Sequence, residues 1–196
     1  MAELEPWYRI AVPRDEVRQG RSFNPDEFAI HLEQVVAGKG TDDYRDPAKF
    51  FLRNVFTRAL KEHAGMVLQR LSGITQNASP VLTLVTQFGG GKTHTLATLY
   101  HLATSGKAAS EYSGVSDLLH AAGLSECPTA KVAAFVGNAW DPRPGRETPW
   151  LDVARPTGRS GRDCGTGPIR TAVCTGYGSP GPALRSRWGT GLNPLR

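Results

Sequence analysis

The sequence has few cysteines and no long apolar run, and both shortages narrow the classes of protein it can represent. Its 196 residues include three cysteines, an odd number without Cys-x-x-Cys or Cys/His ligand spacing, so neither a disulfide scaffold nor a structural zinc site is expected. No stretch reaches the roughly 20 apolar residues of a membrane span, and charges and prolines interrupt the first thirty residues, unlike a signal peptide. We therefore expect no membrane contact and a cytoplasmic location.

Positive charge is concentrated at the end of the chain. The formal net charge is +5 at pH 7, but residues 155–196 contain seven arginines and a single acid. Residues 1–154 carry 16 basic and 17 acidic side chains. Because the globular-looking part is close to neutral, the overall charge does not indicate what that part binds.

The last 42 residues lack any apolar period and contain nine glycines and five prolines. Such a segment buries too little apolar surface to offset the entropy of ordering, so residues 155–196 are expected to be disordered. One interpretation is a nucleic-acid-binding arm, although Tyr177 and Trp188 are its only aromatic residues suited to base stacking. We favour the hypothesis that this tail is a frameshift product of GC-rich DNA and that the native protein continues further.

Residues 1–78 have the patterning of amphipathic helices. A helix is predicted to start at Asn24-Pro25-Asp26-Glu27, which combines a cap residue, proline at the first helical position and an early acid, and to end at Gly38. A second, longer helix is predicted from Asp46-Pro47 to Gly73. Its expected apolar stripe consists of Phe51, Val55, Ala59, His63, Val67 and Leu71.

Residues 79–154 alternate between strand and helix patterns. The run Val81-Leu82-Thr83-Leu84-Val85 is typical of a strand buried on both faces, and residues 132–136 are a second candidate. Between them, helices are predicted from the glycines at 89–91 to Gly106 and over residues 115–122. Strand, helical crossover and strand indicate a parallel βαβ unit. The predicted fold class is α/β: a partial P-loop NTPase parallel sheet, preceded by amphipathic helices and followed by the disordered tail.

A glycine-rich loop stands between the first predicted strand and its helix. Residues 86–93 read Thr-Gln-Phe-Gly-Gly-Gly-Lys-Thr and match the phosphate-binding pattern GxxxxGK[ST] at its last three positions, with Thr86 in place of the first glycine. Gly89, Gly90 and Gly91 would turn backbone N–H groups toward phosphate oxygens. Lys92 is the predicted phosphate cation and Thr93 the predicted Mg²⁺ ligand.

Other residues near the loop have weaker claims to a role. His94, in the first helical turn, is included among the nucleotide-binding candidates, with a half-exposed helix residue as the alternative. After the second predicted strand, Asn138 and Asp141 are candidates for a phosphate contact and a metal-site acid, because ligands collect at the carboxyl edge of such sheets. Arg143 and Arg146 are candidate arginine fingers, with a solvated loop as the alternative. No convincing Walker B acid ends the strand.

Several segments resemble a known family. They are "PWYRIAVPRDEVRQGR", "FAIHLEQVVAG", "YRDPAKFFLRNVFTRAL", "VLTLVTQFGGGKTHTLATLYHL" and "FVGNAWDPRPGRETPW". Together, over residues 6–154, they resemble the N-terminal part of a family of large bacterial and archaeal P-loop ATPases, catalogued mainly as a domain of unknown function in the AAA+-like superfamily. The resemblance implies ATP as ligand, with Gly89, Gly90, Gly91, Lys92 and Thr93 as binding positions, and genes near DNA-modification and phage-defence loci.

Three functional interpretations follow. The leading one is an ATP- and Mg²⁺-binding fragment of an ATPase whose full-length form hydrolyses ATP to act on DNA or a protein partner, this chain itself being inactive in hydrolysis. The second is a non-catalytic nucleotide-binding or scaffold fragment. The third is a nucleic-acid binder acting through the basic tail.

Overall fold

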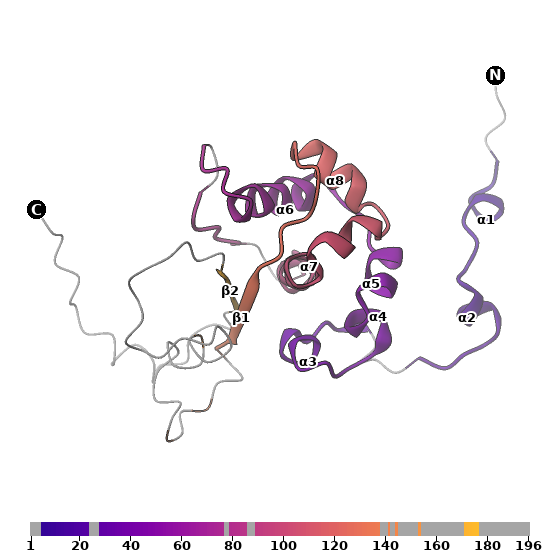
Figure 1. Ribbon diagram of the computed structural model, residues 1–196. Helices are drawn as coiled ribbons and strands as arrows, with labels where there is room; N and C mark the ends of the chain where they lie inside the picture. Colours follow the sequence, from indigo (N-terminus) through magenta and orange to yellow (C-terminus); the bar gives the residue numbers. More distant parts are fainter. Residues whose placement is uncertain are drawn as a thin grey trace, which may run out of the picture.

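The structure is a computed structural model that describes residues 5–23, 28–76, 79–85, 89–137, 141, 144, 153 and 171–176. Helices dominate these residues (Figure 1). The elements, in chain order, are α1 (Trp7–Ile10), α2 (Asp15–Arg18), α3 (Leu32–Val36), α4 (Asp42–Arg45), α5 (Pro47–Arg53), α6 (Arg58–Leu71), α7 (Lys92–Ser105), the 3₁₀ helix η2 (Gly106–Glu111), α8 (Val115–Ala121), β1 (Lys131–Val136) and β2 (Thr171–Gly176). None of the described helices is long and apolar enough to cross a bilayer.

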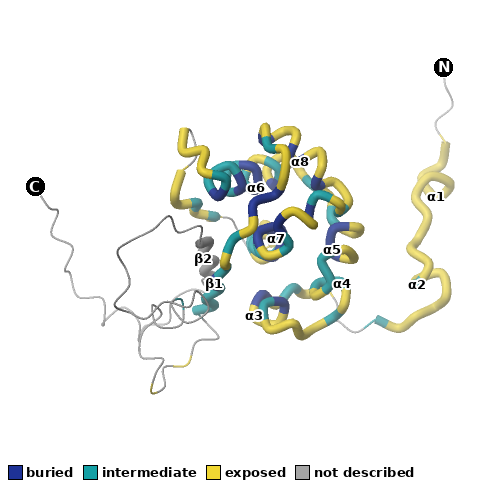
Figure 2. The backbone as a smooth tube through the Cα atoms, viewed as in Figure 1, coloured by how far each residue is buried: buried dark blue, intermediate teal, exposed yellow. Residues whose placement is uncertain are grey.

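Helix α7 forms the centre of the core. Its buried side chains pack in one cluster with those of α5, α6 and α8, and the dark-blue residues of Figure 2 cluster around it. Its buried side chains fall on more than one face of the helix, which agrees with a sequence rich in Ala, Leu and Thr rather than one with a single apolar stripe. Leu102 and Ala97 are fully buried and pack in one cluster with Phe51, Leu68 and Leu118. The predicted helices at 92–106 and 115–122 are thus confirmed by α7 and α8.

The long helix predicted from Asp46 to Gly73 is wrong, because the structure divides it into α5 and α6. Its start is confirmed: the Asp46 carboxylate accepts a hydrogen bond of 2.9 Å from the backbone N–H of Ala48, with Pro47 at the first position. Asn54 then adopts an extended conformation, and the Thr57 hydroxyl accepts from the backbone N–H of Leu60 to cap α6. Thr57 is a better helix start than a mid-helix residue, since its β-branched side chain hydrogen-bonds the backbone.

The break also changes the buried face. Val55 lies between the two helices with 78% of its surface exposed, and Ala59 is exposed at the start of α6. The buried positions of α6 are Leu60, Ala64, Gly65, Leu68 and Leu71. Of the predicted stripe residues that lie on α6, only Leu71 is buried. The helix begins anew at residue 58, and this changes which of its residues face the core.

The first predicted helix is shorter than expected among the described residues. Its predicted start at residues 24–27 lies outside them, and regular helix begins only at Leu32. Leu32 and Val35 are buried, whereas Phe28 is 66% exposed. Gly38, with φ of 66°, follows the helix as predicted.

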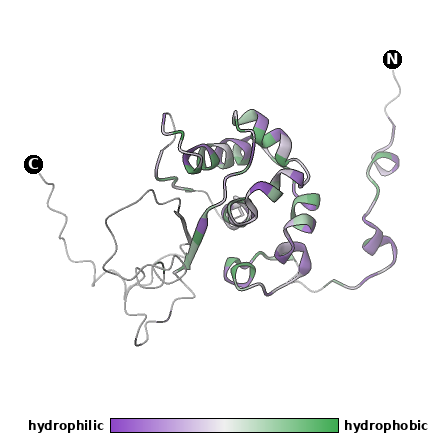
Figure 3. Cartoon of the chain, in the orientation of Figure 1, coloured by the Kyte–Doolittle hydropathy of each residue, from purple (hydrophilic) through white to green (hydrophobic). Residues whose placement is uncertain are grey.

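Residues 5–23 form an N-terminal arm that carries α1 and α2. Most of its residues are exposed, including Trp7 at 75% and Ile10 at 70%, and Figure 3 shows α2 as largely hydrophilic. Figure 1 places both short helices at one side of the packed helices. The arm therefore adds no residue to the core described above.

The strand pattern is only partly realised. β1 matches the strand predicted at 132–136, but it pairs in parallel with β2, in the register Lys131 with Thr171 and Val136 with Gly176. Residues 81–85 are not a strand, and Val81 and Val85 are 71% and 86% exposed, since no described strand pairs with them. β2 falls within the segment expected to be disordered, so that expectation does not hold for residues 171–176. The larger parallel sheet and the disorder of the remaining tail stay predictions.

Candidate functional site

The glycine loop lies directly before the central helix. Gly89 and Gly91 have φ angles of 80° and 73°, a left-handed conformation that other residues rarely adopt. A Cβ added at either position would meet no heavy atom of the described residues within 4 Å, so space adjoins both glycines in the described part of the chain. The backbone N–H and the hydroxyl of Thr95 donate to the Gly91 carbonyl, at 2.9 and 3.0 Å, which fixes the first turn of α7 against the loop.

The N-terminus of α7 has the properties of an anion-binding position. The helix has 14 residues, and the N–H groups of its first turn have no intrahelical partners. The positive end of the helix dipole lies at the same turn. Gly89, Gly90, Gly91 and Thr93 are exposed and Lys92 is half-buried, so the predicted binding positions are gathered at one accessible place. Thr86, the departure from the usual pattern, lies outside the described residues.

The side chain of His94, in the first turn of α7, contacts Asn54 and Phe50. Its Nε2 lies 2.7 Å from Oδ1 of Asn54, and its ring lies 5.1 Å from the ring of Phe50. Burial lowers the pKa of His94, so the neutral imidazole is favoured and its Nε2–H donates to the Asn54 carbonyl oxygen. Asn54 Nδ2 is buried and has no hydrogen-bond partner among the described residues. His94 therefore joins the loop to the turn between α5 and α6.

A cavity of about 380 Å³ separates the loop from α6. The first wall is formed by the residues from Gly89 to Thr95, with the exception of Thr93. The second wall is formed by residues of the α5–α6 turn, of α6 and of the segment before the loop. The residues of that second wall are Val55, Thr57, Ala59, Leu60, His63 and Leu84. The volume falls within the roughly 300–1,000 Å³ typical of small-molecule sites.

The residues of the second wall were not predicted as site residues. The usable signal lay in Thr57 of this wall together with the neighbouring Asn54, because an Asn-x-x-Thr spacing with a β-branched residue between them disfavours an uninterrupted helix. Recognising that break would have placed a turn next to the glycine loop. The proximity of His63 to the loop depends on helix packing over about thirty residues of sequence, which no local pattern reports.

The other predicted residues are not gathered at this site. Asn138, Arg143 and Arg146 lie outside the described residues. Asp141 is described but is exposed and does not line the cavity. Within the described ranges, no group of three or more His, Cys, Asp or Glu side chains could hold a metal ion.

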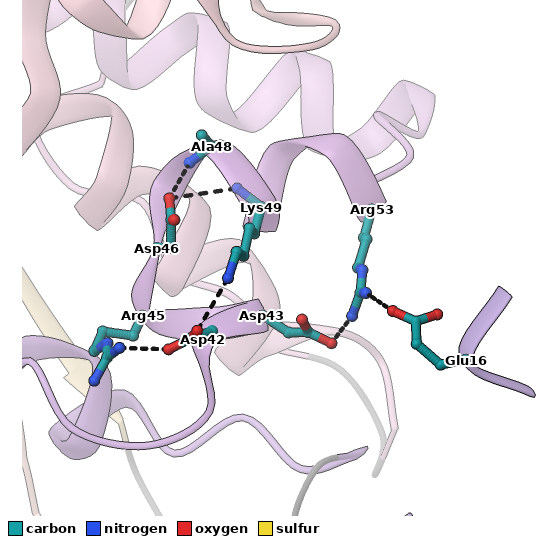
Figure 4. Close-up of polar contacts among 8 residues, drawn as sticks. All are labelled: Glu16, Asp42, Asp43, Arg45, Asp46, Ala48, Lys49 and Arg53. Carbon is teal, nitrogen blue, oxygen red and sulfur yellow. Dashed lines mark hydrogen bonds and ion pairs between the residues drawn. The ribbon is translucent and has the colours of Figure 1, made fainter. Parts of the chain in front are cut away.

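A network of charges connects the arm to the helices (Figure 4). Arg53, at the end of α5, forms ion pairs with Asp43 and with Glu16 of the arm. The Glu16 pKa is lowered, first by a backbone hydrogen bond and then by the nearby Arg53 and Arg14 charges. On α4, Asp42 pairs with Arg45 and, at 2.9 Å, with Lys49, whose hydrogen bond lowers the Asp42 pKa. Arg53 thus holds the arm next to the residue, Asn54, that contacts His94.

Comparison with known proteins identifies a family. No curated protein matches the chain. No solved structure matches it. The family model described as the DUF499 N-terminal domain matches residues 8–125, a span from the arm through the helices and the glycine loop to the end of α8. This match covers more than half of the 196 residues. The chain therefore belongs to the DUF499 family, through that family's N-terminal domain.

Proposed function

We propose that this chain binds ATP with Mg²⁺ through the loop formed by Gly89 to Thr93. The observation that carries the proposal is the pair of left-handed glycines, Gly89 and Gly91, immediately before a 14-residue helix that begins with Lys92-Thr93. Left-handed glycines let successive N–H groups face one point, and the helix dipole favours negative charge there. A plain connecting loop would not need a lysine and a hydroxyl at these two positions.

The residues present suit the ligand's chemistry. Open space adjoins Gly89 and Gly91, the Thr93 side chain is exposed, and the cavity beside them has room for part of a small molecule. Lys92 would neutralise phosphate charge, and the Thr93 hydroxyl would be a ligand of the Mg²⁺ that accompanies the nucleotide. When bound, Mg²⁺ offsets the charge of the β and γ phosphates. His94 would position the loop through Asn54 rather than bind phosphate, because its ring donates to that side chain.

The proposal covers ATP binding and does not extend to hydrolysis by the residues of this chain. Water attack on the γ-phosphate requires an acid beside Mg²⁺ and a group that orients water. In this sequence β1 ends at Val136 and is followed by Gly137 and Asn138, without an acid at the strand end. We therefore expect binding with little or no phosphate release. We also propose a parallel P-loop sheet and a cytoplasmic location. Action on DNA or a protein partner, which the resemblance implies, is the last part of the proposal.

A thermal melt tests the proposal. A ligand at 100 times its Kd stabilises the folded state by about 2.7 kcal/mol, and each kcal/mol moves the Tm of a chain of this size by about 2–4 °C. Saturating Mg·ATP should raise the Tm by at least about 5 °C, and Lys92→Ala should abolish the shift. An unchanged Tm at millimolar Mg·ATP would contradict the proposal.

A further inference from the structure

We infer that the wall of the cavity facing the glycine loop, formed by Val55, Leu60 and His63, binds the base of the nucleotide. This inference rests on the proposed function, since it assigns the part of the ligand that the loop does not hold. It adds a specificity element for a nucleoside triphosphate to a site whose proposed elements recognise only phosphate. The three residues come from the α5–α6 turn and the first two turns of α6.

The position of the wall supports the assignment. The loop at Gly89–Gly91 and the wall residues line the same cavity of about 380 Å³, so a ligand with its phosphates on the loop has the wall as its neighbour. The other residues of the cavity add few charges, because Lys92 is its only Lys, Arg, Asp or Glu among the described lining residues. An apolar wall next to one cation suits a ligand with an uncharged planar end and an anionic end.

His63 supplies the planar contact. Its side chain is half-buried and, among the described residues, has no hydrogen-bond, ion-pair or ring partner. An imidazole face is one of the surfaces on which nucleobases stack. His94, the other histidine of the cavity, is already engaged with Asn54 and Phe50. His63 is thus the aromatic side chain available to a base.

Val55 supplies the apolar contact, beside the largely buried Leu60. Leu60 is 6% exposed and belongs to the helix packing, whereas Val55 is 78% exposed at the cavity. A base seated against Val55 would remove this apolar surface from water, which favours binding. The exposure of Val55 without a ligand also means that polar substitution there should leave the fold intact.

Comparison of the affinities for two ligands tests the inference on the full 196-residue chain. Isothermal titration would compare Mg·ATP with inorganic Mg·tripolyphosphate, which lacks the base and ribose. We expect His63→Ala and Val55→Ser to weaken ATP binding, about tenfold for His63→Ala given the usual strength of base stacking, and to leave tripolyphosphate binding unchanged. His63→Phe, which retains an aromatic face, should restore most of the ATP affinity.

Matched controls and the other outcomes separate this inference from the proposed function. Leu52→Ser removes an apolar side chain that is 74% exposed on α5 and does not line the cavity, and His120→Ala removes an exposed imidazole on α8; both should bind ATP as the unaltered chain does. If Val55→Ser and His63→Ala leave ATP affinity unchanged, or weaken both ligands equally, the base site is wrong while phosphate binding stands. If neither ligand binds the unaltered chain, the proposed function itself is wrong.

Discussion

The imidazole of His94 and the side-chain amide of Asn54 lie 2.7 Å apart and join the first turn of α7 to the turn between α5 and α6. The two residues are 40 positions apart in the sequence, so this contact orients the glycine loop relative to the helices that form the opposite wall of the cavity. Arg53, the neighbour of Asn54, pairs with Glu16 of the arm. One short turn therefore contacts both the candidate site and the N-terminal arm.

The Asn54–His94 hydrogen bond should contribute measurably to stability. Asn54→Ala, His94→Ala and the double variant form a thermodynamic cycle, for which urea unfolding gives the coupling energy. We expect a coupling of about 1 kcal/mol, the usual net value of a partly buried hydrogen bond. Additive effects of the two single variants would show that the contact does not hold the loop in place.

Stability should fall as the solution becomes mildly acidic. Burial lowers the pKa values of His101 and His94 from the ordinary 6.5, although the Tyr44 carbonyl and Asp46 partly oppose this for His101. Below pH 6.5 the unfolded chain therefore binds more protons than the folded chain. The contribution of these histidines to the free energy of unfolding is complete above that pH and decreases below it. The carboxyl groups with lowered pKa values, Glu16 and Asp42, contribute stability above their ordinary pKa values of 4.5 and 3.8, and this contribution is lost only as pH falls below those values.

The window from about pH 5 to 6.5 therefore reports on the two histidines. His101→Gln keeps a side-chain N–H for the Tyr44 carbonyl but does not titrate, so urea unfolding of this variant should show a smaller pH slope in that window. His120→Gln, at an exposed position on α8, is the control and should keep the slope. An unaltered slope in His101→Gln would mean that burial of this histidine does not govern the acid response.

The Arg53 ion pairs should hold the arm in place rather than stabilise the core. Such partly exposed pairs contribute little to stability because solvent screens the charges, so Arg53→Ala should change the free energy of unfolding little. Hydrogen exchange within residues 7–18 should nevertheless become faster. Arg58→Ala breaks an exposed pair with Glu62 that does not touch the arm and should leave exchange there unchanged. Equal exchange in all three proteins would show that Arg53 does not fasten the arm.

Two glycines should respond to alanine in opposite directions. Gly91 has φ of 73°, so Gly91→Ala should cost about 1–2 kcal/mol and weaken ATP binding, with Gly91→Asn less harmful. Gly65 lies within α6, where an added Cβ would be 3.4 Å from the Cβ of Ala122, an ordinary contact. Gly65→Ala should therefore stabilise the protein by about 0.5–1 kcal/mol. Denaturant titration of both variants measures these changes. An unchanged free energy of unfolding in Gly91→Ala would contradict the prediction for the loop.

Local signals predicted the parts of the fold that local chemistry determines. Asp46-Pro47 defined a helix start, Gly38 and Gly106 follow helix ends, and the central helix follows the glycine loop at Lys92. The glycine loop itself was found because its backbone geometry depends on residue types that are adjacent in sequence. These features do not require any knowledge of tertiary packing.

Features that depend on distant contacts were missed. The break at Asn54 was hidden by apolar periodicity that continues across it, and the partner of His94 lies 40 residues earlier. Residues 81–85 are β-branched enough to predict a strand, yet a strand requires a hydrogen-bonding neighbour, and β1 pairs with β2 instead. Propensity describes a residue's preference, whereas pairing is decided by the rest of the chain.

Titration of the chain with Mg·ATP by calorimetry, alongside Lys92→Ala, tests the central claim most directly. We expect the unaltered chain to bind one nucleotide and Lys92→Ala to lose at least about tenfold in affinity, since a charge-assisted contact to phosphate contributes about 1.5–3 kcal/mol. Lys61→Ala, a lysine of α6 that does not line the cavity, should bind as the unaltered chain does. Absence of binding at millimolar Mg·ATP, or equal affinity in Lys92→Ala, would contradict the assignment of the loop.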